Sequence, residues 1–340
     1  MRPSKIDRDF TRVMPSSPRI LLIKTSSLGD VIHALPVASD IARAFPGAAI
    51  DWVVEESFAE IPPLHPAVGT IYRTALRRWR RSLFSQTTRQ EIAAFRQEIQ
   101  SRHYDHVIDL QGLIKSAWIA RQTRGARSGF NFASAREGLA SLVYDHRYGI
   151  AREQHAVLRN RQLAAAALGY SLDALPLDYG IPPLAANIAP HLQKKAGNAT
   201  FALFLTATSR DDKLWREEDW IGLGNDLHAR NIQARLPAGN AVERERAERI
   251  ASRIPGAMVL PPSGIARLAQ HFSGAALAVG VDTGLTHLAC AMGIPTLAIY
   301  TVTDPGLTGV IGTGFFKNLG GKSGPPDLAE VLSATTQALA

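Results

Sequence analysis

The sequence contains a single cysteine, Cys290, among its 340 residues, so no disulfide can form within the chain. Because a free cysteine usually packs as a small apolar side chain, we expect Cys290 to be buried. The sequence also lacks a run of about 18 apolar residues, which argues against a membrane-spanning helix. Residues 1–18 carry charges without an apolar stretch, and we interpret them as a flexible N-terminal tail rather than a secretory signal.

The signatures of several enzyme classes are missing as well. The absence of G-x-G-x-x-G and of the P-loop pattern argues against a plain dehydrogenase or nucleoside triphosphatase. The absence of G-x-S-x-G leaves acyl-enzyme chemistry without support. The carboxylates of Asp211 and Asp212 are flanked by Arg210 and Lys213. This setting disfavours a cation, and we expect neither a metal ion nor another cofactor.

The composition favours a folded protein of two domains. A chain of 340 residues exceeds one ordinary core, and 46% of its residues are hydrophobic. The formal net charge of +8 calls for an acidic partner, which could be a nucleic acid, an anionic membrane surface or a phosphorylated substrate. The positive charge is unevenly distributed, since five arginines lie between Arg73 and Arg81, a segment that also contains Trp79.

Strand-like and helix-like segments alternate through both halves of the sequence, which predicts an α/β fold with two doubly wound, Rossmann-like domains. We place the first domain at residues 19–180, a linker at 181–195 and the second domain at 196–325. Residues 326–340 are predicted to form a C-terminal helix that packs back on the first domain. In open α/β sheets, ligands bind beyond the carboxyl ends of the strands. The candidate site therefore comprises the loops at 25–30, 206–213 and 282–287.

The segment VDTGLTHLA at 281–289 is the most informative part of the sequence. It follows an apolar run and opens a helix of small residues. Unpaired backbone N–H groups and the helix dipole at such a turn favour an anion, so a phosphorylated ligand is its natural occupant. His287 lies on the first helical turn, where it could be structural or could act at the anion site.

The other two loops each allow a functional and a structural interpretation. Asp30 begins a helix after the first strand, where its carboxylate should stay ionised and could accept a proton from a hydroxyl. Alternatively, Asp30 or Ser27 only caps that helix. In the loop from Thr206 to Trp215, hydroxyls and Lys213 could bind phosphate oxygens, or the loop could simply be capped and solvated.

Seven segments resemble a known family in the order of the chain: KTSSLGDVIHALP (24–36), DWVVEESFAEIP (51–62), LRRWRRSLFS (76–85), QGLIKSA (111–117), TSRDDKLW (208–215), VDTGLTHLA (281–289) and TDPGL (303–307). The chain resembles the bacterial lipopolysaccharide heptosyltransferases, which are ADP-heptose glycosyltransferases with the GT-B fold. The motif LRRWRR is similar to that of the enzymes that add the first heptose, heptosyltransferase I. The resemblance implies two Rossmann-like domains that face each other across a cleft.

The resemblance also implies a reaction. An inverting enzyme would move L-glycero-D-manno-heptose from ADP-heptose to the first Kdo of Kdo2-lipid A, with Asp30 as general base and Lys213 opposing the charge on the leaving diphosphate. The matching donor-binding positions are Thr208, Ser209, Lys213, Glu243, Asp282, Thr283, Gly284 and His287. The matching acceptor-binding positions are Ser26, Ser27, Arg77, Arg78, Arg80, Arg81, Lys115, Arg136, His155 and Arg159.

The resemblance further implies a location and a set of partners. We expect a cytoplasmic monomer, held peripherally on the cytoplasmic face of the inner membrane, that uses ADP-heptose and Kdo2-lipid A and does not bind nucleic acid. Two rivals stay open: a second heptosyltransferase or related epimerase of the same fold, and a non-catalytic basic module for nucleic acid or membrane. The arginine segment could also be only a solvated helix face. Ala238 and Ser263 depart from the family pattern near the nucleotide.

Overall fold

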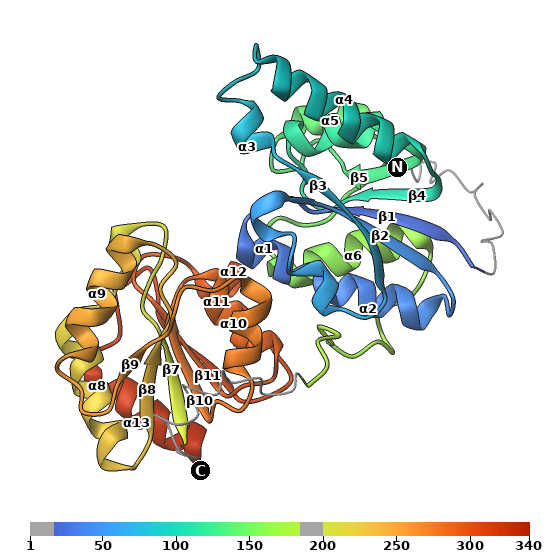
Figure 1. Ribbon diagram of the computed structural model, residues 1–340. Helices are drawn as coiled ribbons and strands as arrows, with labels where there is room; N and C mark the ends of the chain where they lie inside the picture. Colours follow the sequence, from blue (N-terminus) through green and yellow to red (C-terminus); the bar gives the residue numbers. More distant parts are fainter. Residues whose placement is uncertain (1–16, 184–199) are drawn as a thin grey trace.

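The computed structural model describes residues 17–183 and 200–340 and contains two lobes, each built on a six-stranded parallel sheet (Figure 1). The N-terminal tail falls almost entirely outside the described residues, as does most of the predicted linker. Within the two described ranges, no helix combines the length and the apolar character that a bilayer span requires.

The first sheet has the strand order β3-β2-β1-β4-β5-β6. Its strands are β1 (Arg19–Ile23), β2 (Ala49–Glu55), β3 (Val68–Thr74), β4 (His103–Asp109), β5 (Arg124–Phe130) and β6 (His146–Tyr148). The α-helices of this domain are α1 (Leu28–Ile32), α2 (Leu35–Ala44), α3 (Leu76–Trp79), α4 (Gln86–Gln100), α5 (Ile114–Gln122) and α6 (Ala156–Leu168). Short 3₁₀ helices are η1 (Glu56–Phe58), η2 (Pro62–Leu64) and η3 (Gly138–Val143).

The second sheet has the order β12-β11-β10-β7-β8-β9. Its strands are β7 (Phe201–Leu205), β8 (Gln233–Leu236), β9 (Met258–Val259), β10 (Leu277–Val281), β11 (Thr296–Tyr300) and β12 (Phe316–Gly320). The helical elements are η4 (Asp211–Lys213), α8 (Glu217–Ala229), α9 (Ala241–Ala251), α10 (Ile265–Phe272), α11 (Gly284–Ala291), α12 (Pro305–Thr308) and α13 (Leu328–Leu339). Numbered within its own domain, each sheet has the order 3-2-1-4-5-6, so both are doubly wound as predicted.

The C-terminal helix α13 differs from its prediction. It packs against α8, β11 and β12 of the second domain, and Val331 and Ala334 are buried in the core of that domain. Figure 1 shows the C-terminus at the end of the second lobe that is far from the first domain. The prediction that this helix packs on the first domain is therefore wrong. Its apolar face completes the core beside α8, which leaves no such face for the other lobe.

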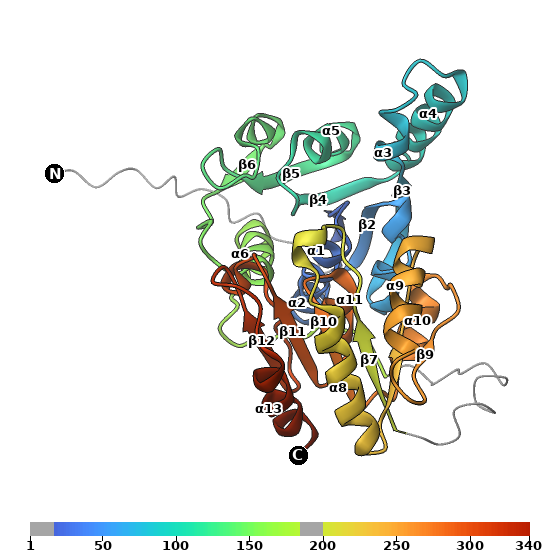
Figure 2. The ribbon, with the colours of Figure 1, turned by 90° about the vertical axis from the view of Figure 1, so that its left-hand side faces the viewer.

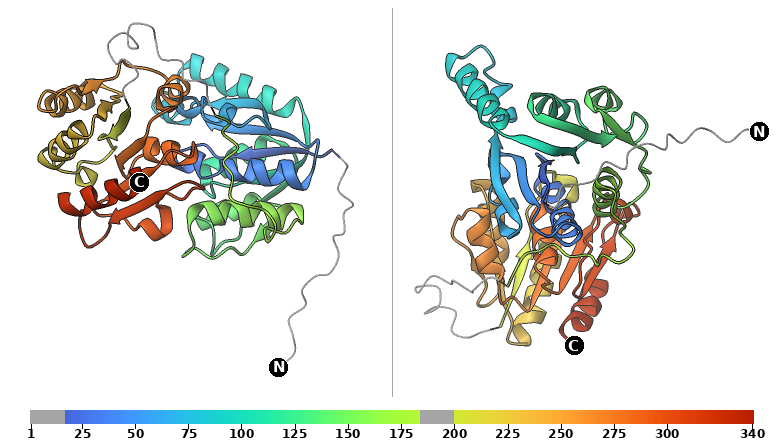
Figure 3. Two further views of the ribbon diagram at one scale, coloured as in Figure 1. Left: turned by 90° about the horizontal axis from the view of Figure 1, so that it is seen from below. Right: turned by 90° about the vertical axis from the view of Figure 1, so that its right-hand side faces the viewer.

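The central strands of each sheet are buried on both faces, which is why they appear as unbroken apolar runs. In β1, residues Ile20 to Ile23 are fully buried, and all of β7 and β10 is buried. One apolar cluster combines side chains of both domains, among them Val31 and Leu35 from the first and Leu205 and Leu288 from the second. The lobes thus share packed apolar surface where α1 lies beside α11 (Figure 2). The views in Figure 3 show the same close approach of the two lobes.

Candidate active site between the domains

A cleft of about 940 Å³ lies between the two domains. Its walls include the loops that follow β1 and β4 in the first domain and β7 and β10 in the second. In each sheet, these are the central strands between which the chain reverses its direction of winding, where ligands of open α/β folds bind. The three predicted loops therefore meet in one place, although they are far apart in the sequence.

The cleft contains most of the predicted site residues. Those that line it are Ser27, Asp30, Arg77, Arg136, Arg159, Thr208, Ser209, Lys213, Glu243, Asp282, Thr283, Gly284 and His287. The predicted residues that are not part of its lining are Ser26, Arg78, Arg80, Arg81, Lys115 and His155. Thr303, Arg152, Gln154 and Asn160 also line the cleft and were not singled out from the sequence.

Asp30 lies in the first turn of α1, and its carboxylate caps that helix. Its Oδ2 accepts hydrogen bonds from the backbone N–H of Ser27 at 2.8 Å and from the Ser27 hydroxyl at 3.0 Å. The capping interpretation is therefore confirmed. It does not compete with a role in proton transfer, because a carboxylate has a second oxygen and Asp30 faces the cleft.

Buried Lys24, half-buried Lys115 and the amide of Gln111 hold the loop that carries Asp30. The Lys24 ammonium donates to the carbonyl of Leu110 at 2.7 Å, and burial lowers its pKa while the nearby carboxylates of Asp30 and Asp109 oppose the shift. The Lys115 ammonium donates to the Ser26 hydroxyl at 2.8 Å. The side-chain oxygen of Gln111 accepts from the backbone N–H groups of Thr25 and Ser26, at 3.1 and 3.2 Å. Lys115 and Ser26 thus support the Asp30 loop without lining the cleft themselves.

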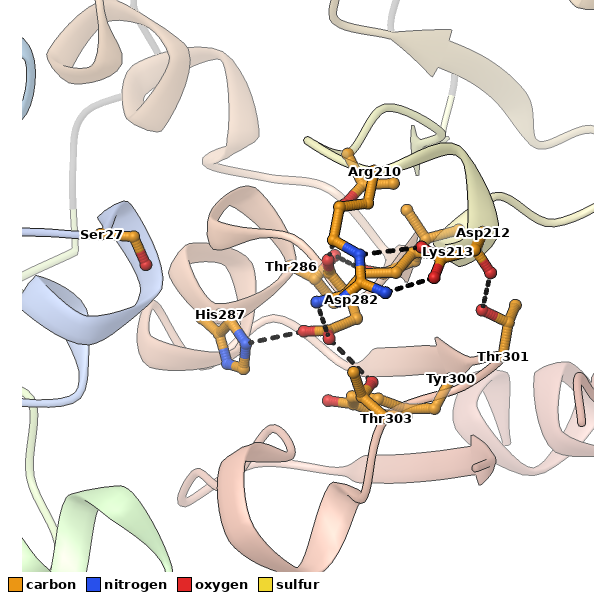
Figure 4. Close-up of polar contacts among 12 residues, drawn as sticks. Ser27, Arg210, Asp212, Lys213, Asp282, Thr286, His287, Tyr300, Thr301 and Thr303 are labelled. Atoms are coloured by element: carbon orange, nitrogen blue, oxygen red, sulfur yellow. Dashed lines mark hydrogen bonds and ion pairs between the residues drawn. The ribbon is translucent and has the colours of Figure 1, made fainter. Parts of the chain in front are cut away.

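On the opposite wall, Asp282 is the centre of a polar cluster (Figure 4). Its Oδ2 accepts hydrogen bonds from Lys213 at 2.7 Å and from the Thr303 hydroxyl at 2.8 Å. The Nε2 atom of His287 lies 3.8 Å from Oδ1 of Asp282. The backbone carbonyl of Asp282 accepts from the Thr208 hydroxyl at 3.0 Å. Burial alone would raise the pKa of the Asp282 carboxyl, but its interactions with His287, Lys213 and Thr303 outweigh burial and hold that pKa below its usual range.

The loops of the second-domain wall are held by hydrogen bonds to the backbone. The Arg246 guanidinium donates to the carbonyls of Thr206 and Trp215, at 2.8 and 2.6 Å, and so fixes both ends of the loop between them. Glu243 lies in the first turn of α9, where its Oε2 accepts from the backbone N–H of Gly239 at 2.7 Å. Glu243 is thereby presented at the edge of the cleft.

Arg77 and Arg78, two neighbours in the arginine segment, have different surroundings. Arg77 lines the cleft and its guanidinium lies 5.3 Å from the centre of the Phe58 ring. Arg78 instead pairs with Glu56 and with Glu91, at 3.1 and 2.7 Å. Arg78 therefore braces η1 against α4, and its charge is already matched by two carboxylates.

The described lining of the cleft is positively charged. Six cationic side chains line it (Lys24, Arg77, Arg136, Arg152, Arg159 and Lys213), against three carboxylates (Asp30, Glu243 and Asp282). Five of the six cations belong to the first domain, whereas two of the three carboxylates belong to the second. Among the described residues, no group of three or more His, Cys, Asp or Glu side chains could hold a metal ion. The excess of positive charge therefore lies on the first-domain wall, which is suited to anions, whereas Lys213 is the one cation of the described lining on the second-domain wall.

Comparison with known proteins assigns the chain to a family. The profile of glycosyltransferase family 9 (heptosyltransferase) matches residues 92–322, which include most of the cleft. The chain belongs to this family. It is therefore a glycosyltransferase of lipopolysaccharide biosynthesis, as the sequence resemblance implied.

Similar proteins match most of the length of this chain. Lipopolysaccharide heptosyltransferase 1 of Escherichia coli (strain K12) is 45% identical over 295 residues, covering 86% of this chain and 91% of that protein. The enzyme of the same name from Pseudomonas aeruginosa is 46% identical, covering 86% and 81%. The structure of E. coli heptosyltransferase WaaC with ADP has a TM-score of 0.84 at 42% identity and covers 95% of this chain and all of that one. The predicted GT-B fold is confirmed by this likeness and by the two sheets.

Proposed function

We propose that this family 9 glycosyltransferase transfers L-glycero-D-manno-heptose from ADP-heptose to the first Kdo of Kdo2-lipid A, with inversion at the anomeric carbon. The observation that carries the proposal is the cleft itself, which places Asp30 on one wall and the Lys213–Asp282 pair on the other. Structures of a relative at 42% and 41% identity contain ADP and ADP-2-deoxy-2-fluoro heptose, which supports an ADP sugar as the donor.

The donor side follows from the second domain. Backbone N–H groups at the start of α11, together with Lys213, would stabilise the diphosphate and the charge that develops on it as ADP leaves. Asp282 would accept hydrogen bonds from hydroxyls of the heptose, and Glu243 from the ribose. Because Lys213 supplies the positive charge, we propose that no metal is needed. Transfer should be unchanged in EDTA, and an activity restored only by added Mg²⁺ would contradict this.

The acceptor side follows from the first domain. Asp30 would remove the proton from the Kdo hydroxyl as that oxygen attacks the anomeric carbon opposite the diphosphate, which inverts its configuration. Arg77, Arg136 and Arg159 are the predicted acceptor residues that line the cleft. Arg152, which lines the same cleft, is added to this group, since Kdo carboxylates and lipid A phosphates are anionic.

The decisive experiment compares two acceptors. Purified protein is incubated with ADP-heptose and either Kdo2-lipid A or the same lipid already carrying one heptose, and the products are identified by mass spectrometry. We expect transfer to Kdo2-lipid A and little to the heptosylated lipid. The opposite preference would indicate a second heptosyltransferase, and no transfer to either acceptor would refute the proposal.

We also propose peripheral attachment to an anionic membrane surface. Leu83 and Phe84, which are 51% and 90% exposed, are separated from the exposed Arg80 and Arg81 only by Ser82, so apolar and cationic side chains occur together as membrane contacts require. Sedimentation with vesicles containing anionic lipid at low salt should be weakened by Phe84→Ser. Val242→Ser, which changes an exposed side chain of the second domain, is the matched control. A wild-type protein that never sediments with the vesicles would contradict this attachment.

A further inference from the structure

A histidine of the first domain meets a histidine of the second beside the donor wall of the cleft. His33 follows α1, and its Nε2 lies 3.1 Å from Nδ1 of His287 in α11. The two rings meet edge to face, with centroids 4.5 Å apart and planes at 82°. Both side chains are buried, at 3% and 6% exposure. Water therefore competes little for this hydrogen bond between the domains.

Two glycines allow the histidines to meet. A Cβ on Gly29 would lie 3.2 Å from the His287 ring, and a Cβ on Gly284 would lie 2.4 Å from the Leu28 side chain. The N-terminal turns of α1 and α11 therefore approach more closely than other side chains would permit. Because His33 is four residues after Gly29 and His287 is three after Gly284, both rings project from the faces that touch.

The direction of the hydrogen bond follows from Asp282. Nε2 of His287 faces the Asp282 carboxylate at 3.8 Å, and an ionised carboxylate only accepts. The tautomer of His287 that carries its proton on Nε2 directs this N–H at the carboxylate and leaves Nδ1 to accept. Nε2 of His33 is then the donor, and the remaining nitrogen of His33, Nδ1, carries a lone pair.

The surroundings of His33 agree with this assignment. Its Nδ1 is a buried atom without a hydrogen-bond partner. The opposite tautomers would bury an unpaired N–H there and would also turn a lone pair of His287 toward the carboxylate, at a cost of about 1–3 kcal/mol for the unpaired group. Burial lowers the pKa of His33 well below its ordinary value, and the neighbouring His287, His155 and Lys24 lower it further, so the ring is neutral.

We propose that His33 is a positioning residue for heptose transfer. Through His287 it holds the Asp282 carboxylate in the orientation that the donor sugar requires, and the donor site is complete only while the two domains are in contact. This inference rests on the proposed function, in which Asp282 binds the heptose of ADP-heptose. His33 belongs to the first domain, so the orientation of Asp282 in the second domain would depend on contact with the first.

The first test compares two substitutions of His33. His33→Leu removes the donor, whereas His33→Gln keeps an N–H at a position similar to Nε2. We expect kcat/KM for ADP-heptose to fall about tenfold or more in His33→Leu, as loss of a hydrogen bond in a charged cluster implies, and to recover largely in His33→Gln. The affinity for ADP, which lacks the heptose, should not change. His271→Leu, at another buried histidine outside the cleft, controls for the loss of a buried ring.

The outcomes separate the two proposals. If the wild type transfers heptose and His33→Leu matches it in kcat/KM, or if His33→Gln is as impaired as His33→Leu, the positioning role is refuted. If the wild type neither transfers heptose nor binds ADP-heptose more tightly than ADP, the proposed function is refuted instead.

A double substitution tests whether His33 acts through His287. In a His287→Leu background, His33→Leu should cause no further loss of kcat/KM, because the contacts that link His33 to Asp282 through His287 are already broken. Losses that multiply would show that His33 acts by another route. Thermal unfolding of each variant establishes that the comparison is made between folded proteins.

Discussion

At the scale of single residues, the carboxylate of Asp30 has two tasks. One oxygen caps α1 by accepting from Ser27, and in the proposed reaction the carboxylate also takes the acceptor's proton. Substitution by Asn separates these tasks, because the amide oxygen can still accept from the backbone N–H while the amide is not a base.

We expect Asp30→Asn to lower kcat by about 10²–10⁴, the usual contribution of a positioned general base, and to leave the affinity for ADP unchanged. Steady-state kinetics and calorimetry measure the two quantities. Ser27→Ala removes only the hydroxyl contact to Asp30 and serves as the control for disturbance of the cap. A kcat of Asp30→Asn within a few-fold of the wild-type value would remove Asp30 from the role of base.

At the scale of elements, the contact between α1 and α11 depends on the absence of a side chain at residue 284. In Gly284→Ala, the new Cβ would collide with Leu28, and overpacking of this kind typically costs about 1–3 kcal/mol. We expect a lower thermal midpoint and a higher KM for ADP-heptose, because α11 must move away from α1.

The compensating change is Leu28→Ala, which removes the atoms that the new methyl group meets. Gly284→Ala should therefore lower the thermal midpoint less in the Leu28→Ala background than it does in the wild type. Purely additive thermal midpoints would show that the collision is relieved elsewhere in the structure.

The sequence predicts elements well where burial is uniform along a strand. The segment AIDWVVE at 49–55 predicts a strand because apolar residues dominate it, and it forms β2, in which every residue after Ala49 is buried. The strand β5, RGARSGF at 124–130, is not predicted, since its residues have little apolar character and it is defined by pairing with β4 and β6. The sequence from Gly29 to Phe45, which is followed by Pro46 and Gly47, predicts one helix. The structure instead divides it into α1 and α2 around His33 and Ala34.

The candidate site is predictable to a similar degree. Asp282 and Lys213 are found because each lies in a loop directly after a buried strand. Thr303 and His33 are not, because their roles depend on tertiary packing: Thr303 reaches Asp282 from the loop after β11, and His33 meets its partner only when the domains pack. The pairing of Arg78 with two carboxylates is likewise invisible in a run of arginines.

At the scale of the whole molecule, buried histidines make stability depend on pH. Burial lowers the pKa of His33, His65, His155 and His271. In the unfolded chain these rings bind protons below about pH 6.5, whereas in the folded protein they bind them only at lower pH. The unfolded state therefore binds more protons in this window, so the free energy of unfolding falls as the pH falls below about 6.5.

For His33 the contribution can be isolated with His33→Gln, which does not titrate. Chemical unfolding between pH 5 and 6.5 should show a pH slope that is smaller than that of the wild type by up to about 1.4 kcal/mol per pH unit, the maximum for one proton. An unchanged slope would mean that His33 titrates in the folded protein as it does in the unfolded chain.

The contacts between domains also include the carboxylate of Glu60, which accepts from the backbone N–H of Ala266 at 2.8 Å in the first turn of α10. The tyrosine hydroxyl of Tyr179 donates to the carbonyl of Ile311 at 2.8 Å, and Nε2 of His155 to that of Gly309 at 2.9 Å. Each of these groups would lose its partner if the lobes moved apart.

The apolar cluster shared by the lobes has a consequence for any attempt to study them singly. A fragment ending before residue 184 would expose Val31 and Leu35 to water, and one beginning after it would expose Leu205 and Leu288. Exposed patches of this kind promote aggregation. Each fragment should accordingly aggregate when it is produced alone. When the two are produced together, each should cover the apolar surface of the other, and activity should return.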